Sequence, residues 1–165
     1  MPITVPVADI CDAHRGRVRV LDADWRAFTT VAKFAGPARL VALHAADRVL
    51  SDMLKEPGDG AVALATVTGR NAVFGDGMAT NAEANGWAGV VIEGAVCDVA
   101  LIRPRQVGVR ALRSHPMFER AGPEGDEVAE MSVAGVWVRK GDWIIADEDG
   151  VIAVDADLAA NLRAP

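Results

Sequence analysis

Apolar residues recur along the chain with two spacings, which together predict an alternation of strands and helices. Short runs rich in apolar residues predict strands at Phe34–Leu43, Ala61–Val67, Val90–Ile92, Val107–Leu112, Val133–Val138 and, with an internal turn, Trp143–Val154. Helices are predicted at Val7–His14, at Asp47–Lys55 and, in an alanine-rich stretch followed by Gly86, at Ala72–Asn85. Polar, glycine-containing segments predict a loop at Gly122–Glu127 and turns at 140–142 and 147–150. Strands predominate, so the pattern predicts a mixed α/β fold.

The length and composition of the chain fit one globular domain, expected to span residues 1–165. The 165 residues are 51% hydrophobic and 24% charged, without a linker, a low-complexity segment or a repeat. A formal net charge of −6 argues against a general nucleic-acid binder, which normally has a basic surface. No apolar run is long enough to cross a membrane, and no basic region precedes an apolar core at the N-terminus. We therefore expect a cytoplasmic protein with no nucleic-acid partner and no membrane partner.

Two short segments between Gly75 and Asp98 are the candidates for chemistry. If a helix begins at the turn Gly75–Met78, its free N–H groups attract a carboxylate, and glycine allows a ligand close to the backbone. Asp98 follows a predicted buried strand, at a position where α/β folds place ligand sites. Asp76 and Asp98 would then lie at one end of the sheet, where carboxylates can hold a divalent cation and accept a proton from water. The alternative is that Asp76 caps a helix and Asp98 belongs to a turn.

Three stretches of the sequence resemble successive motifs of one protein family. They are FAGPARLV, GDGMATNAEANGWAGVVIEGAVCDV and GVWVRKGDWIIADEDGVIAV, and the resemblance extends from about Asp9 to Val154. The family contains the regulator of ribonuclease activity A, RraA, and the 4-hydroxy-4-methyl-2-oxoglutarate aldolases. It implies an α/β, layered ββα swivelling-domain (RraA-like) fold in a single domain. It also implies assembly as a homotrimer, or as a hexamer built from trimers, with pockets between subunits.

The resemblance implies roles for the residues of both candidate segments. In the aldolase branch the backbone of the turn that corresponds to Gly75–Met78 receives the pyruvyl group of the substrate. The acid in that turn, here Asp76, helps to activate water. Asp98 occupies the place of the aspartate that binds a divalent metal, Mg²⁺ or Mn²⁺. Cys97 replaces the family arginine that contacts the pyruvate carboxylate and stabilises the enolate. The implied site is Asp76 and Cys97 for catalysis, Asp98 for the metal, and, for the substrate, Gly75, Asp76, Gly77, Met78 and Cys97.

Cys97 is the main departure from the family pattern. A thiol lacks the charge and the two parallel donors of an arginine, and loss of one such contact typically costs about 10²–10³ in rate. Cys97 could act as a nucleophile with a lowered pKa, or it could simply fill the space that the arginine has left. A replacement for the missing cation would have to come from the arginine-rich segment that follows, which contains Arg103, Arg105, Arg110 and Arg113. The alternative is that this segment is a solvated strand face and turn.

Three functions remain open from the sequence. The first is a metal-dependent lyase that cleaves or decarboxylates a small 2-oxo acid through a pyruvate enolate, of the 4-hydroxy-4-methyl-2-oxoglutarate aldolase or oxaloacetate decarboxylase type. The second is a non-enzymatic regulator that binds a ribonuclease-type protein partner through an acidic surface. The third is a family member whose pocket serves another pathway, consistent with Cys97 and with Ala65–Gly69 in place of a glycine-rich loop. No recognisable adenosylmethionine-binding motif supports a methyltransferase.

Overall fold

Four parallel strands form the centre of the structure. The computed structural model describes residues 2–44, 48–119 and 126–163. The order of the central strands in space is β3 (Phe34–His44), β4 (Val62–Thr68), β6 (Gly89–Val96) and β7 (Gly108–Ser114). Most of their side chains are buried because both faces of the sheet are covered, which explains the apolar runs in the sequence. The structure confirms the strands predicted at Phe34–Leu43, Ala61–Val67, Val90–Ile92 and Val107–Leu112.

Antiparallel strands extend this centre on both sides. β11 (Trp143–Ala146) pairs with β3, β12 (Val151–Val154) pairs with β11, and β1 (Arg19–Val20) pairs with β12. At the other edge β2 (Arg26–Ala27) pairs with β7, while β8 (Asp126–Val128) pairs with β3. β9 (Glu130–Val133) and β10 (Val136–Arg139) form a separate hairpin.

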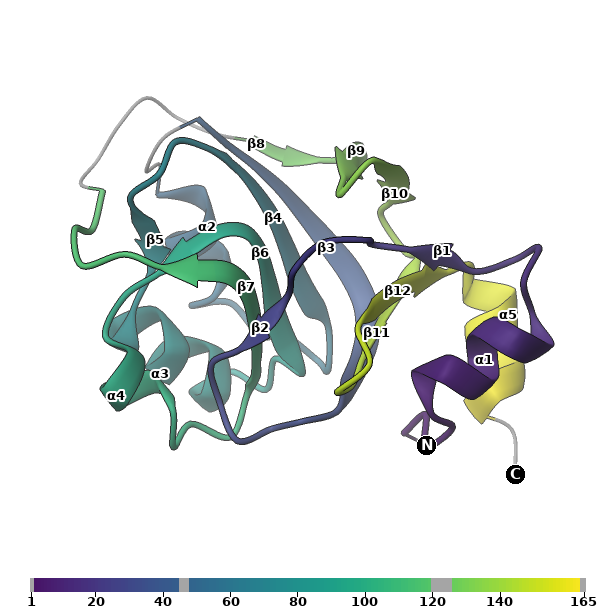
Figure 1. Ribbon diagram of the computed structural model, residues 1–165. Coiled ribbons are helices and arrows are strands. Elements are labelled where there is room, and N and C mark those ends of the chain that lie inside the picture. Colours follow the sequence, from purple (N-terminus) through teal and green to yellow (C-terminus); the bar gives the residue numbers. More distant parts are fainter. Residues whose placement is uncertain (1, 45–47, 120–125, 164–165) are drawn as a thin grey trace.

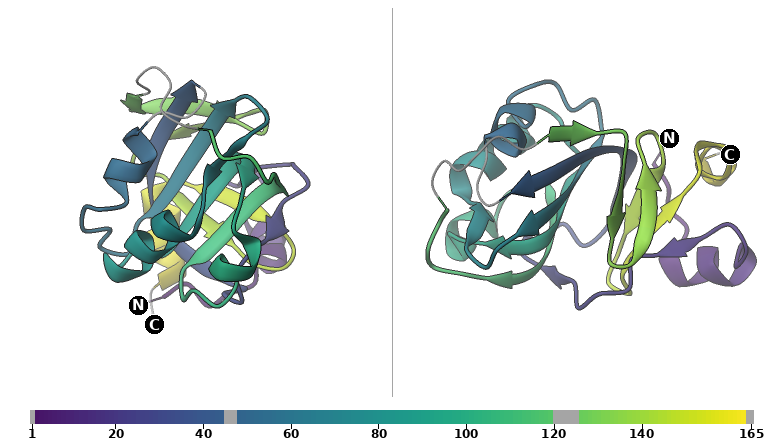
Figure 2. Two further views of the ribbon diagram at one scale, coloured as in Figure 1. Left: turned by 90° about the vertical axis from the view of Figure 1, so that its left-hand side faces the viewer. Right: turned by 90° about the horizontal axis from the view of Figure 1, so that it is seen from above.

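Helices and the hairpin cover the sheet as separate layers. α2 (Val49–Met53), α3 (Asp76–Ala84) and α4 (Val99–Ile102) pack on one face of the parallel strands, and the β9–β10 hairpin packs on the other. α1 (Val7–Ala13) and α5 (Ala156–Arg163) lie side by side at the far end of the molecule, beyond β11 and β12 (Figure 1; Figure 2). No helix in the described segments is long and apolar enough to cross a membrane.

The predicted helix Ala72–Asn85 is wrong over its first residues. Ala72–Phe74 forms strand β5, whose three side chains are buried and which runs parallel to the end of β6. Helix α3 begins only at Asp76, after Gly75 in an extended conformation, and Gly86 follows its end with a φ of 72°. Val73 and Phe74 are strand-favouring residues, and burial together with pairing to β6 includes Ala72 in the strand. The consequence is a sharp strand-to-helix junction at Gly75.

Two expectations for the second half of the chain also need correction. The run Val133–Val138 is not one strand, because Ala134 and Gly135 form a turn with positive φ between β9 and β10. Within the expected loop Gly122–Glu127, residues 126 and 127 belong to β8, and residues 122–125 lie outside the described segments. The loop prediction is therefore wrong for residues 126 and 127, which pair with β3, and stays a prediction for residues 122–125.

The helices agree with the sequence less well than the strands. α1 confirms the helix predicted at Val7–His14, and α2 occupies part of the predicted Asp47–Lys55, of which Asp47 lies outside the described residues. α4 and α5 are additional helices that the apolar pattern did not predict. For α5 a signal was present, because Asp155 is an N-cap residue whose Oδ1 accepts the N–H of Leu158 at 2.7 Å.

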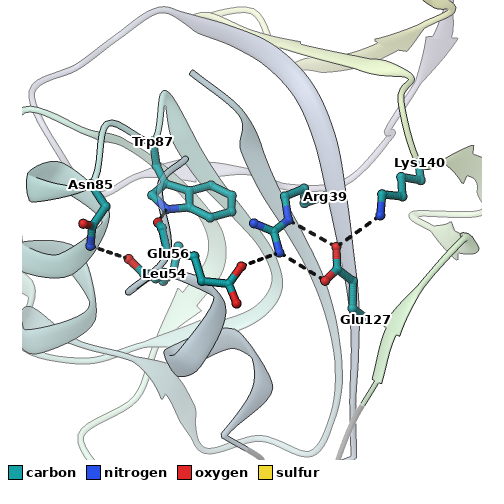
Figure 3. A network of polar contacts seen from close by, with 7 residues as sticks. All are labelled: Arg39, Leu54, Glu56, Asn85, Trp87, Glu127 and Lys140. Carbon is teal, nitrogen blue, oxygen red and sulfur yellow. Dashed lines mark hydrogen bonds and ion pairs between the residues drawn. The ribbon is translucent and has the colours of Figure 1, made fainter. Parts of the chain in front are cut away.

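Arg39 of β3 joins three parts of the fold (Figure 3). Its Nε and Nη2 atoms each lie 3.1 Å from a carboxylate oxygen of Glu127 in β8, and Nη2 lies 3.0 Å from Oε2 of Glu56, which follows α2. The ring of Trp87 is 5.3 Å from the Arg39 Cζ atom, and its Nε1–H donates to the carbonyl of Glu56. The hydrogen bonds from Arg39 lower the pKa of Glu127. This network fixes β8 and the segment after α2 against β3.

Candidate active site

The β5–α3 and β6–α4 junctions bring the two candidate segments together. β5 and β6 are parallel neighbours, so their carboxyl ends meet at one edge of the sheet. Gly75 leads from β5 into α3, while Cys97 and Asp98 lead from β6 into α4. The N–H of Cys97 donates to the carbonyl of Phe74 at 2.9 Å, which holds the two junctions side by side. The structure thus brings Asp76 and Asp98 to the same edge of the sheet.

A cavity of about 680 Å³ opens between these junctions. Its wall consists of Gly75–Met78, Cys97 and Asp98, together with Ser51, Thr80, Asn81, Pro116 and Phe118. A second cavity of about 410 Å³ shares Cys97 and Asp98 with the first and extends to Ser114 and His115. Asp98 therefore borders two hollows, each large enough for a small organic acid.

Asp98 combines an uncommon backbone conformation with an exposed carboxylate that accepts a backbone hydrogen bond. Its φ of 53° and ψ of 36° lie in the left-handed region, which aspartate tolerates better than most residues do. Its Oδ2 accepts the N–H of Asp76 at 3.2 Å and lies 3.5 Å from Sγ of Cys97. A Cβ atom at position 75 would come within 2.7 Å of that oxygen, so Gly75 is what leaves room beside the carboxylate.

The first turn of α3 supplies backbone donors to the cavity wall. The first hydrogen bond of the helix joins the N–H of Ala79 to the carbonyl of Gly75 at 3.0 Å. The N–H groups of Gly77 and Met78 precede this bond and therefore have no carbonyl one turn earlier in the helix. The N-terminal end of a helix also carries a partial positive charge, which favours an anion. A ligand carboxylate in the cavity can accept hydrogen bonds from both groups.

Asp76 is held by a cation from the loop after α4. Arg105 donates to Oδ1 of Asp76 from Nη2 at 2.7 Å and from Nε at 3.2 Å, and its Nη1 lies 3.4 Å from Oε2 of Glu83. The hydrogen bond to Asp76 is the main reason why the pKa of Arg105 is raised. The sequence distinguishes Arg105 from the three neighbouring arginines by no local signal, because the pair joins residues 29 positions apart through the contact of α3 with α4.

The other three arginines of that segment lie elsewhere, and none of them is in the described wall of either cavity. Arg110 is buried within β7 and donates to the carbonyls of Ala32 and Asp147. Arg113 donates to the carbonyls of Gly69 and Arg70. Arg103 is exposed, and its side chain makes no ion pair with another described residue. Among the four, Arg105 alone is paired with a cavity carboxylate in the described part of the chain.

Cys97 is buried beside Asp98. Burial, and to a lesser extent the negative charge of Asp98, raises the pKa of its thiol to about 11. The thiol is therefore protonated at neutral pH, whereas a cysteine nucleophile must be a thiolate. This environment favours the interpretation of Cys97 as a residue that fills space over its interpretation as a nucleophile.

The donor atoms at the site suit a cation that keeps most of its water. The described residues include no group of three or more histidine, cysteine, aspartate or glutamate side chains that could hold a metal ion together. Asp98 offers one carboxylate, next to the space that a side chain at Gly75 would fill. Mg²⁺ is commonly held by one or two carboxylates, with water and substrate oxygens as its other ligands. The residues present are therefore compatible with a hydrated Mg²⁺ or a similar cation.

These features define an α/β protein with a small-molecule cavity at the carboxyl ends of its parallel strands. The chain belongs to the RraA-like family, since the family model described as Aldolase/RraA matches residues 7–153. A relative from Alkalilimnicola ehrlichii, provisionally named 4-hydroxy-4-methyl-2-oxoglutarate aldolase, is 36% identical over 152 residues, or 91% of this chain and 94% of the relative. A relative from Burkholderia mallei with the same provisional name is 38% identical over 154 residues, or 89% and 93%.

Two solved structures are similar over nearly the whole chain. One, from Geobacillus kaustophilus, is named S-adenosylmethionine:2-dimethylmenaquinone methyltransferase. It has a TM-score of 0.89 and 27% identity, covering 94% of this chain and 98% of that one. The RNA-processing inhibitor RraA from Thermus thermophilus has a TM-score of 0.85 and 30% identity, covering 91% and 92%. These similarities confirm the layered RraA-like fold that the sequence motifs imply.

Proposed function

We propose that the protein is a divalent-metal-dependent lyase that forms pyruvate from a small 2-oxo acid by aldol cleavage or decarboxylation. The observation that carries the proposal is the convergence of free helical N–H groups, Asp76 and Asp98 on one cavity. The names of the Alkalilimnicola and Burkholderia relatives support the same reaction class. The 4-hydroxy-4-methyl-2-oxoglutarate and oxaloacetate types of substrate both contain the required 2-oxo acid group.

The first turn of α3 binds the substrate in this proposal. The carboxylate next to the 2-oxo group accepts hydrogen bonds from the N–H groups of Gly77 and Met78, which the helix leaves without partners. Asp98 would hold the metal, and that cation would supply a Lewis acid for the 2-oxo oxygen. Gly75 keeps the space beside Asp98 open. These contacts orient the substrate before any bond is broken.

Asp76 acts as the proton acceptor. In aldol cleavage, a water held by Asp76 accepts the proton of the C4 hydroxyl group and passes one to the carboxylate. The C3–C4 bond breaks as the new carbonyl forms, and its electron pair becomes the enolate of pyruvate. The enolate then takes a proton at C3, and pyruvate leaves. In decarboxylation the same enolate forms by loss of CO₂, so Asp76 is needed mainly to supply the later proton through water.

The proposal is tested by the release of pyruvate. Purified protein with Mg²⁺ is given oxaloacetate or 4-hydroxy-4-methyl-2-oxoglutarate, and pyruvate is followed by a coupled assay against a metal-only blank. We expect release above the blank, and we expect Asp98→Asn to lower kcat/KM by about 10²-fold or more because the metal contributes several kcal/mol of charge stabilisation. Asp157→Asn, which removes a carboxylate on α5 at the far end of the molecule, is the matched control. Equal rates for the protein and the blank with both substrates would contradict the proposal.

A regulator of RNA processing is the second candidate. Cys97 favours it, because the cavity lacks the arginine that the family resemblance associates with the enolate. The similarity to the structure of the Thermus RNA-processing inhibitor adds support. A ribonuclease assay with and without the protein separates the two candidates: inhibition of RNA cleavage together with no pyruvate release would favour the regulator.

A further inference from the structure

The ion pair between Asp76 and Arg105 fixes one oxygen of the carboxylate and leaves the other one available. Both hydrogen bonds from Arg105, at 2.7 Å and 3.2 Å, go to Oδ1 of Asp76. The side chains are 29% and 31% exposed, so the pair is partly shielded from water. No described residue makes a hydrogen bond or ion pair with Oδ2 of Asp76, and Asp76 lines the cavity. Oδ2 is therefore the oxygen that a water or a substrate hydroxyl group can reach.

We propose that Arg105 is a positioning residue that holds the Asp76 carboxylate in the orientation required for proton transfer. The inference rests on the proposed function of Asp76. A proton acceptor must lie within about 2.6–3.2 Å of its donor or of a bridging water, so freedom of rotation in a short side chain would weaken it. Arg105 restricts that rotation through two donors on one rigid, planar group. It acts from behind the carboxylate, since it is not part of the cavity wall.

The presence of Asp98 makes this restraint more important. The N–H of Asp76 donates to Oδ2 of Asp98, so two carboxylate residues are close together at the cavity. An Asp76 side chain without a partner could turn into solvent or toward a cation held by Asp98, and either change would remove its free oxygen from the substrate. The two hydrogen bonds from Arg105 oppose both movements because they attach Oδ1 to the loop after α4.

A purely structural role for Arg105, as a tether of its own loop, is less consistent with the contacts. That loop is already attached to α3 without Arg105, because the N–H of Gln106 donates to Oε1 of Glu83 at 2.6 Å. The contact of Arg105 with Glu83 is longer, at 3.4 Å, than its contact with Asp76 at 2.7 Å. The shorter contact of Arg105 is thus with Asp76, the residue to which we assign proton transfer. The loop itself is attached to α3 by the separate hydrogen bond between Gln106 and Glu83.

Kinetics of the Arg105→Gln variant with Mg²⁺ and 4-hydroxy-4-methyl-2-oxoglutarate, whose cleavage needs Asp76 as proton acceptor, test the inference. We expect kcat to fall by about 10–100-fold, as is common when a supporting partner of an active-site group is removed. KM should change by less than about threefold, because the N–H groups that bind the carboxylate are not altered. Arg105→Lys should recover part of kcat, since it restores the charge without the planar pair of donors.

Two control variants and one combined variant separate positioning from other effects. Arg103→Gln removes the same charge two residues away without touching Asp76, and Glu83→Gln removes the other ion-pair partner of Arg105. Both should retain kcat within about threefold. In the Asp76→Asn background, Arg105→Gln should cause no further loss, because a residue that acts only through Asp76 has nothing left to position.

The outcomes distinguish failure of this inference from failure of the proposed function. An equal loss in Glu83→Gln, or a full additional loss in the Asp76→Asn background, would overturn positioning and leave the lyase proposal intact. If the unmodified protein releases no pyruvate, the proposed function fails, and a crystal structure of Arg105→Gln decides the remaining question. A displaced or disordered Asp76 carboxylate supports the restraint, whereas an unmoved carboxylate overturns it.

Discussion

Two glycines of the same turn have different surroundings, so one substitution has opposite consequences at the two positions. A Cβ atom at Gly75 would lie 2.7 Å from Oδ2 of Asp98 and 3.0 Å from Sγ of Cys97, whereas a Cβ atom at Gly77 meets nothing within 4 Å. We expect Gly75→Ala to lower the free energy of unfolding by about 1–3 kcal/mol through overpacking. Gly77→Ala should raise it by up to about 1 kcal/mol, because alanine is the better helix former.

Urea denaturation of the unmodified protein, Gly75→Ala and Gly77→Ala measures these changes in the free energy of unfolding directly. In the lyase assay Gly75→Ala should also lose activity, because its methyl group displaces the Asp98 carboxylate. A Gly75→Ala protein that is as stable and as active as the unmodified chain would show that the space beside Asp98 is not needed.

At the scale of the elements, the network of Arg39 gives a prediction with a defined pH dependence (Figure 3). Arg39→Ala removes the contacts with Glu127 and Glu56 and the stacking on Trp87, and should destabilise the protein by about 1–2 kcal/mol at pH 7. The pKa of Glu127 is lowered in the folded state, so its pairing stabilises the fold fully above its ordinary pKa. The stabilisation from the Arg39–Glu127 pair is lost as the pH falls through the lowered pKa of Glu127.

The difference in unfolding free energy between the unmodified protein and Arg39→Ala should therefore become smaller as the pH is lowered from 7 to 3. Lys140→Ala is the control, because Lys140 is 63% exposed and lies 3.8 Å from Glu127; we expect a change within about 0.5 kcal/mol. A difference between Arg39→Ala and the unmodified protein that stays constant with pH would assign the effect to packing on Trp87 alone.

The elements also show which sequence signals were sufficient. The parallel strands could be predicted because full burial leaves an apolar run that polar turns interrupt. The start of α3 could not, because Ala72–Phe74 directly precedes the alanine-rich helix and no polar boundary in the apolar pattern separates the two; its pairing with β6 is a tertiary contact. The turn at Ala134–Gly135 was hidden for a related reason, since a hairpin with apolar residues on both sides has no polar boundary. For the site, spacing placed Asp76 and Asp98 together, but the Asp76–Arg105 pair depends on tertiary packing.

At the scale of the whole molecule, we expect assembly into a homotrimer, or into a hexamer of two trimers, as the family resemblance implies. Leu101, Met117 and Phe118 are apolar but 58%, 62% and 42% exposed, which is consistent with a surface that a second copy would cover. Light scattering after size-exclusion chromatography should give three or six times the 17.3 kDa mass of the chain. A single-chain mass at micromolar concentration would contradict this expectation and would place the cavity on a monomer.

The left-handed backbone of Asp98 has a consequence for the way sequences of relatives can be compared. Two constraints act on the residue at this position: the need for a carboxylate, and the need to adopt a positive φ. Different residue types satisfy each of them. A lineage that abandons the carboxylate can still accommodate asparagine or glycine there without rebuilding the β6–α4 junction, because both tolerate positive φ. A β-branched residue would instead indicate that the junction itself has been remodelled. The identity of the replacement thus distinguishes a relative that has lost a ligand from one that has lost the local architecture.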